Sequence, residues 1–127
     1  MRLLLDTHAL LWWLDDSPRL GGTAHGAISE PGNEVFVSLI SLWEFAIEIR
    51  VGKLKVDLAA VDDRIDAEGF VRLPLAMEHL RAVVPLPMHH RDPFDHLLIA
   101  QAQVEGLTFV TADRFAASYD VAVLACG

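Results

Sequence analysis

The side chains in this sequence that are best suited to chemistry are carboxylates placed at the ends of expected elements. Two follow apolar runs that have the character of buried strands, and two fall in the first turn of expected helices. They are Asp6, Asp113, Glu44 and Asp95. Like charges that are brought together repel one another, so a cluster of them suggests a bound cation. Oxygen ligands suit Mg²⁺ or Mn²⁺, whereas zinc favours cysteine and histidine.

The elements that must position these acids follow from the apolar pattern. Strands are expected at residues 2–5, 35–37, 70–73, 107–110 and 121–124. Helices are expected at residues 8–14, 22–29, 41–51, 57–68, 77–84 and 94–105. The strands are apolar without alternation and are separated by helices, which indicates a parallel sheet covered on both faces. We therefore expect a three-layer α/β/α sandwich with a central, mainly parallel, twisted sheet.

The carboxyl ends of the strands are the place where such a sheet holds its site. The segments that carry the four acids all belong to that edge. Two of the acids directly follow strands, and two lie in the first turn of helices that connect one strand to the next. The sequence therefore predicts one acidic site there rather than four scattered surface charges.

Each acid also has a structural explanation. The acids that follow strands could be ordinary turn residues. Glu44 stands three residues after Ser41, which is the spacing of a capping box. Asp92 precedes Pro93 and suits a helix N-cap, and Asp95 in the same first turn favours the helix dipole. The coincidence of four acids at one sheet edge favours a site.

The composition limits the class of protein. With 127 residues, 53% of them hydrophobic, the chain can bury a core, and we expect one domain over residues 1–127. The formal net charge of −8 argues against charge-driven binding of nucleic acid but permits contact with phosphates through cations. No apolar run approaches the ~20 residues of a membrane span. The single cysteine, Cys126, cannot form an internal disulfide, which favours a reducing cytoplasm.

Four stretches of the chain resemble the PIN domain family, and within it the VapC-type toxins of bacterial toxin–antitoxin pairs. The stretches follow the family's order through nearly the whole chain. They are residues 4–12 (LLDTHALLW), 41–44 (SLWE), 91–102 (RDPFDHLLIAQA) and 110–113 (VTAD). Each motif by itself is weak, and their combination in order is specific.

The resemblance implies an endoribonuclease that depends on Mg²⁺ or Mn²⁺ and hydrolyses RNA to leave a 5′-phosphate and a 3′-hydroxyl. Carried over by position, its catalytic acids are Asp6, Glu44, Asp95 and Asp113. Asp6, Asp95 and Asp113 are the expected metal ligands, with Glu44 binding through water or helping to hold a second metal. The resemblance also implies a homodimer and a small VapB-like antitoxin that blocks the site.

Some residues near these acids are secondary candidates. Asp95 is preferred to Asp92 because an inward-facing acid should precede the buried apolar run of its helix by about one turn. Glu48 lies one turn beyond Glu44 on the same helix face and could assist or replace it. Thr111 resembles a polar residue that supports the last acid of the family's site.

The expected contacts to substrate phosphate are basic residues close to the motifs. They are Arg114, which follows Asp113, and the pair His89 and His90, which precedes the third motif. Solvated surface positions are the alternative for all three.

The short helix expected at residues 8–14 is apolar nearly all round. If one side faces the sheet, Leu11 and Trp12 are left on another side, as a patch that a partner such as the antitoxin could cover. The next helix or a dimer mate could cover them instead.

Two other classes of protein remain as alternatives. A catalytically silent PIN-like interaction module would share the fold, although all four acids are present here. A receiver-like Mg²⁺-binding signalling domain uses a lysine late in the chain, whereas the only lysines here are Lys53 and Lys55. A phosphate-transfer enzyme of the haloacid dehalogenase kind would need a second acid two residues after Asp6, where His8 stands.

Overall fold

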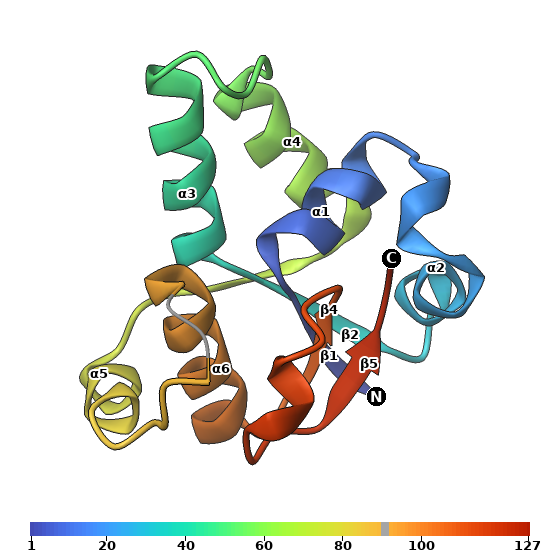
Figure 1. Cartoon of the computed structure of the whole chain (residues 1–127). Coiled ribbons are helices and arrows are strands. Elements are labelled where there is room, and N and C mark those ends of the chain that lie inside the picture. Colours follow the sequence, from blue (N-terminus) through green and yellow to red (C-terminus); the bar gives the residue numbers. More distant parts are fainter. Residues whose placement is uncertain (90–91) are drawn as a thin grey trace.

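The computed structural model describes residues 1–89 and 92–127, and it has five parallel strands in the order β3-β2-β1-β4-β5 (Figure 1). Strand β1 (Arg2–Leu5) lies at the centre and pairs with β2 (Glu34–Ser38) and β4 (Thr108–Thr111). The edge strands are β3 (Val71–Leu73) and β5 (Val123–Ala125). Because all strands are parallel, their carboxyl ends meet at one edge.

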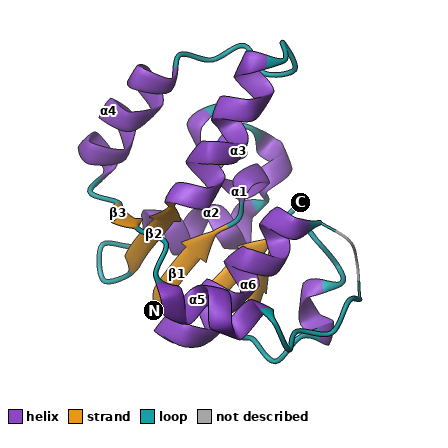
Figure 2. Cartoon of the chain, turned by 90° about the vertical axis from the view of Figure 1, so that its left-hand side faces the viewer, coloured by secondary structure: helices purple, strands orange, loops and turns teal. Residues whose placement is uncertain are grey.

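Helices cover both faces of the sheet, as the apolar strands predicted. One face is packed by α1 (Thr7–Leu14), α2 (Gly22–Ser29) and α4 (Leu58–Glu68). The other face is packed by α6 (Pro93–Glu105) and the short helix η2 (Ala116–Ser118). Helix α5 (Met77–Val83) packs against α6 on this side (Figure 2). This arrangement is the three-layer sandwich that the sequence predicted.

The central strand shows why both faces must be covered. Leu3 and Leu5 belong to one hydrophobic core and Leu4 to the other, and all three side chains have 0% exposure. Successive residues of a strand point to opposite faces. Burial of consecutive leucines therefore needs a layer of helices on each side.

Helix α3 (Leu39–Arg50) leaves the carboxyl end of β2 and extends beyond the sheet beside α4 (Figure 1). Ile40 packs in the core on the α6 side, and Phe45 packs in the core on the α1 side. The helix therefore sits over the edge of the sheet, between α1 and α6, where it can bring a side chain to the carboxyl ends of the strands.

The start of α3 differs from the expectation. The helix begins at Leu39, because Oγ of Ser38 accepts a hydrogen bond from the backbone N–H of Ile40 and acts as the N-cap. Ser41 is buried inside the helix, so the capping box with Glu44 is wrong, and Glu44 lies in the second turn rather than the first.

The last strand also differs, since β5 begins two residues later than expected. Helix α6 agrees with its expected start. Oδ1 of Asp92 accepts hydrogen bonds from the N–H groups of Phe94 (2.9 Å) and Asp95 (3.3 Å), with Pro93 at the first helical position. The structure thus confirms Asp92 as an N-cap, and this cap places Asp95 in the first turn.

The patch expected on α1 is smaller than the sequence suggested. Leu11 and Trp12 are partly buried and pack against the core, as do Trp13 and Leu14. The expectation of two large side chains left in water is therefore wrong, because neighbouring segments reach over this short helix. Among the helices of residues 1–89 and 92–127, none is long and apolar enough to cross a membrane.

Candidate active site

Asp6 occupies the junction between β1 and α1, and its side chain is only 3% exposed. Its Oδ1 accepts a 2.7 Å hydrogen bond from the N–H of Ala9, so it caps α1. Its Oδ2 accepts a 2.6 Å hydrogen bond from Oγ1 of Thr111. Burial raises the pKa of Asp6, against the effect of these hydrogen bonds. Each oxygen keeps a further lone pair with which to bind a cation.

Thr111 ends β4 and connects two of the predicted acids. The same Oγ1 that donates to Asp6 accepts a 3.0 Å hydrogen bond from the N–H of Asp113. Oδ1 of Asp113 in turn accepts from the N–H of Phe115 at 2.9 Å. The pairing of β1 with β4 brings these strand ends together.

Glu44 is held from α1 by Thr7. Oγ1 of Thr7 lies 2.7 Å from Oε1 of Glu44, to which it donates, and 3.2 Å from Oγ of the buried Ser41. Partial burial raises the pKa of Glu44, although the hydrogen bond from Thr7 lowers it. The negative charges of Asp92 and Glu48 raise this pKa further. The Thr7 contact joins α3 to the start of α1, next to Asp6.

Asp95 shows that the predicted acids form one electrostatic cluster. Its pKa is raised to about 8, first by burial and then by the charges of Asp92, Asp6, Asp113 and Glu44. Two carboxylates raise each other's pKa only when they lie close together in a medium that screens poorly. The charges of the other three acids that the sequence selected therefore all act on Asp95.

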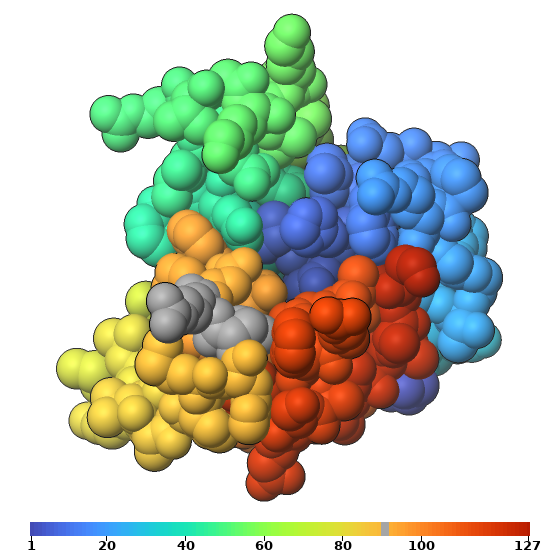
Figure 3. Space-filling model, in the orientation of Figure 1, coloured from blue at the N-terminus to red at the C-terminus, as the bar shows by residue number. Residues whose placement is uncertain are grey.

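The cluster opens into a pocket of about 550 Å³. Figure 3 shows the hollow where segments from the N-terminal part, α6 and the C-terminal part of the chain meet. The pocket is lined by Asp6, His8, Leu11, Trp12, Arg19, Asp95, Ala112 and Asp113. Three acids thus line the same pocket as the side chains of Trp12 and Arg19.

The donor set fits a hard divalent cation. The three acids that line the pocket offer only oxygen, as Mg²⁺ and Mn²⁺ prefer. Among the residues that the structure describes, no group of three or more acidic, histidine or cysteine side chains is arranged to hold a metal ion by itself. Mg²⁺ does not need such a group, because it keeps several waters and binds through one or two carboxylates. A bound cation would also relieve the repulsion that raises the pKa of Asp95.

Two of the three basic residues expected at the substrate, Arg114 and His89, do not line this pocket. Arg114 is exposed, with its guanidinium carbon 5.2 Å from the ring centroid of Phe115. The ring of His89 lies 4.8 Å from that of Tyr119, and the backbone N–H of His89 donates to the Tyr119 hydroxyl at 3.0 Å. His90 lies outside the described residues.

Three residues near the acids were missed from the sequence. Thr7 directly follows Asp6, and Ser41 opens the second motif, so their positions carried a signal that was not used. Arg19 carried none, because it belongs to the short helix η1 (Pro18–Leu20), outside every motif.

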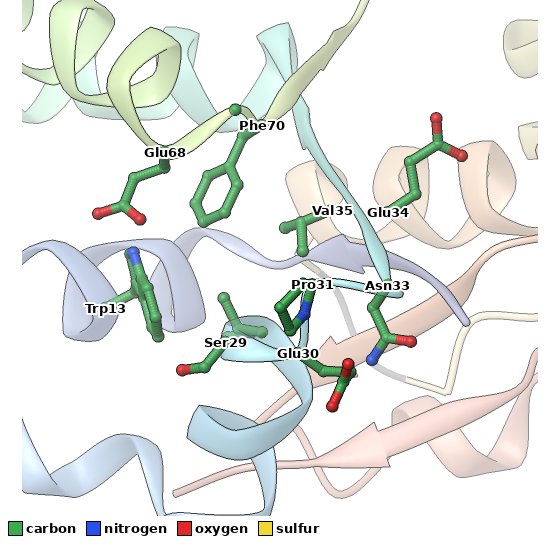
Figure 4. A pocket seen from close by; sticks show the side chains of 11 residues that line it. Trp13, Ser29, Glu30, Pro31, Asn33, Glu34, Val35, Glu68 and Phe70 are labelled. Carbon is green, nitrogen blue, oxygen red and sulfur yellow. The ribbon is translucent and has the colours of Figure 1, made fainter.

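A second pocket, of about 510 Å³, lies at the amino ends of β2 and β3. Figure 4 shows Trp13 from α1 on one side of it, with Glu68 and Phe70 from the end of α4 and the residues that follow. None of the four acids of the cluster lines it. Size therefore does not distinguish the two pockets, but the carboxylate chemistry does.

The chain matches a known protein family over most of its length. Residues 3–121 match the PIN domain family, and the chain belongs to that family. No curated protein matches the chain by sequence.

Several solved structures are similar in fold. VapBC2 from Rickettsia felis, bound to a promoter DNA fragment, aligns with a TM-score of 0.72 and 15% identity over 100% of both chains. A toxin–antitoxin complex from Klebsiella pneumoniae aligns with a TM-score of 0.62 and 19% identity, covering 96% of this chain and 95% of that one. FitAcB from Neisseria gonorrhoeae aligns with a TM-score of 0.56 and 20% identity, and the alignment covers 96% of each chain.

Proposed function

We propose that this chain is a divalent-metal-dependent endoribonuclease and the toxin of a toxin–antitoxin pair. The observation that carries the proposal is the pocket in which Asp6, Asp95 and Asp113 meet, with the pKa of Asp95 raised to about 8 by burial and by the surrounding acids. Membership of the PIN domain family supports it, because PIN domains are generally nucleases that use divalent metals.

In this proposal Asp6, Asp95 and Asp113 hold Mg²⁺ or Mn²⁺, and Glu44 contributes through water or at a second metal. When bound, the cation neutralises charge on the scissile phosphate and lowers the pKa of water, so that hydroxide is available at neutral pH. Thr111 fixes the orientation of the Asp6 carboxylate through its hydrogen bond.

The other residues around the acids act by holding them in place. Thr7 holds the Glu44 carboxylate, and the cap by Asp92 sets the first turn that carries Asp95. RNA hydrolysis by in-line attack of water on phosphorus would leave a 5′-phosphate and a 3′-hydroxyl.

No covalent nucleophile is assigned to this reaction. The hydroxyl of Ser41 is buried against Thr7. Burial raises the pKa of the Cys126 thiol to about 12, with a contribution from the charge of Asp6, so it stays protonated at neutral pH. Both side chains are therefore poor nucleophiles, and an activated water is the better candidate.

The antitoxin belongs to the same proposal. A more apolar pocket of about 320 Å³ lies between α1 and α4 and is lined in part by Leu14, Phe45 and Val61. Leu11 lines both this pocket and the acidic one. A partner segment that lies along α1 would therefore reach the acids, where an arginine could bind carboxylates bidentately. The similar structure from Klebsiella pneumoniae is a toxin–antitoxin complex. A homodimer, as the family resemblance implies, is part of the proposal too.

The proposal is tested by incubating the purified chain with structured RNA in Mn²⁺, in Mg²⁺ and in chelator. We expect cleavage only with metal, 5′-phosphate products, and loss of cleavage in Asp95→Asn. Asp120→Asn, which changes an exposed acid outside the pocket, is the matched control. Addition of the product of the neighbouring gene should stop cleavage. A chain that binds that product tightly but cleaves no RNA in any metal would be a silent interaction module instead.

A further inference from the structure

Arg19 is the only lysine or arginine among the described residues that line the acidic pocket. It lies in η1, and its side chain is exposed. The rest of that pocket is acidic or apolar apart from His8. The positive charge of Arg19 lies beside three carboxylates, in a chain with a formal net charge of −8.

The structure fixes Arg19 from two directions. Its guanidinium carbon lies 5.3 Å from the ring centroid of Trp12, within the range of a cation–π contact. Its backbone N–H donates to Oγ of Ser17, and the N–H of Ser17 donates to the carbonyl of Trp12 at 2.8 Å. The turn that carries Arg19 is thereby tied to the end of α1, the helix that Asp6 caps.

Trp12 is itself held in place. Its ring lies so close to Gly127 that a Cβ at that position would stand 3.3 Å from two ring atoms. The ring of His8 lies 5.8 Å from it on the other turn of α1. Trp12 is therefore a supported ring over which the guanidinium carbon of Arg19 lies.

Arg19 forms no ion pair with an acid in the described part of the chain. Three other arginines form ion pairs there: Arg2 with Glu34, Arg64 with Glu68, and Arg72 with Asp62 and Asp66. Arg19 joins none of these pairs, although three carboxylates line the same pocket. A guanidinium in this position suits an anion that enters the pocket from solution.

We propose that Arg19, supported by Trp12, binds a phosphate of the RNA strand next to the one that is cleaved. The inference rests on the proposed nuclease function and names a substrate contact of that same site. The guanidinium fork matches two phosphate oxygens, which a lysine ammonium cannot do. An acidic protein gains little attraction for RNA from its overall charge, so a single placed cation carries much of the electrostatic recognition.

The test compares Arg19→Ala and Arg19→Lys with the wild type in single-turnover cleavage of a short single-stranded RNA. Arg81→Ala, at an exposed position on α5, is the matched control. We expect Arg19→Ala to lose about 10- to 100-fold in cleavage rate at subsaturating protein, the range for one charge-assisted hydrogen bond. Arg19→Lys should lose less, and Arg81→Ala should match the wild type.

The contact is located by replacing one phosphate at a time with a neutral methylphosphonate, next to a 2′-O-methyl sugar for stability. At one position beside the scissile bond, the wild type should fall to the rate of Arg19→Ala, and Arg19→Ala should fall no further. If each methylphosphonate lowered the cleavage rate by the same factor in the wild type and in Arg19→Ala, the proposal would be overturned. Arg19 would then act on the structure of the protein and not on one phosphate. The proposal would also be overturned if Arg114→Ala, and not Arg19→Ala, removed the sensitivity of the cleavage rate to that methylphosphonate.

Binding in Ca²⁺, measured by anisotropy of the same RNA, separates this inference from the nuclease proposal. Loss of one phosphate contact should reduce the slope of log affinity against log salt by about 0.7 for a single strand. If the wild type cleaves no RNA but Arg19→Ala shows this change, the nuclease function fails and the contact stands. If cleavage is normal and the slope is unchanged, the contact fails and the nuclease stands. Weakening of the antitoxin complex alone would also reject the RNA assignment.

Discussion

Oγ1 of Thr111 lies 2.6 Å from Oδ2 of Asp6, although 105 positions of sequence separate the two residues. The contact is possible because β1 and β4 are neighbours in the sheet and end together. The same hydroxyl oxygen accepts from the N–H of Asp113. One small side chain, with 1% exposure, therefore sets the positions of two acids.

Replacement of this hydroxyl in Thr111→Val should lower both stability and cleavage. A buried carboxylate oxygen and a backbone N–H both lose their partner, and we expect a loss of about 1–3 kcal/mol in the free energy of unfolding. Thr111→Ser should retain most of both properties. Thr108→Val, a half-buried position on the same strand, is the control. Urea unfolding and cleavage rates measure the effect, and full activity in Thr111→Val would show that Asp6 does not need this contact.

Asp92 and Asp95 should separate into a structural and a chemical role. Asp92→Ala removes an N-cap and should cost about 0.5–2 kcal/mol of stability while most cleavage is kept. Asp57→Ala removes the N-cap of α4 and serves as the matched control for the cost of a cap. Melting curves and nuclease assays on the same preparations decide the assignment.

Asp95→Asn should behave in the opposite way. It should abolish cleavage and, in the presence of chelator, raise the melting temperature, because it removes repulsion within the cluster. A variant that cleaves at the normal rate would remove Asp95 from the catalytic acids.

The contact between Thr7 and Glu44 predicts a non-additive pair of substitutions. Thr7→Val should lower cleavage by about tenfold, the effect of one hydrogen bond to a charged group, and Thr7→Ser should restore it. In Glu44→Gln, the further effect of Thr7→Val should largely disappear, because residues in one network couple. A double-mutant cycle on cleavage rate measures the coupling. Additive losses would mean that Thr7 acts on stability and not through Glu44.

The Cys126 thiol should be unreactive in the folded protein. Its pKa of about 12 leaves very little thiolate at neutral pH, and the thiolate is the reactive form. We expect alkylation by iodoacetamide to be at least about 100-fold slower than in the same protein in denaturant. Cleavage should persist in Cys126→Ser. Rapid alkylation of the folded chain would show that the thiol is neither desolvated nor protected.

The fold class and the choice of acids were accessible from the sequence because both depend on local patterns. Runs such as residues 2–5 are apolar on both faces, which only a sheet covered on both sides can bury. The preference for Asp95 over Asp92 needed only helical spacing and the position of Pro93. Whether the four acids carry catalysis is still a prediction of the sequence and the geometry.

Other features depended on contacts between distant segments, which no local pattern records. The start of α3 was decided by the cap from Ser38 and by burial of Ser41 beside Thr7, two serines that look alike in the sequence. Trp12 is covered because the C-terminal Gly127 returns to α1. Arg19 reaches the acidic pocket because the turn after α1 folds back over Trp12. Long-range pairing of this kind is fixed by the packing of the whole sheet and its helices.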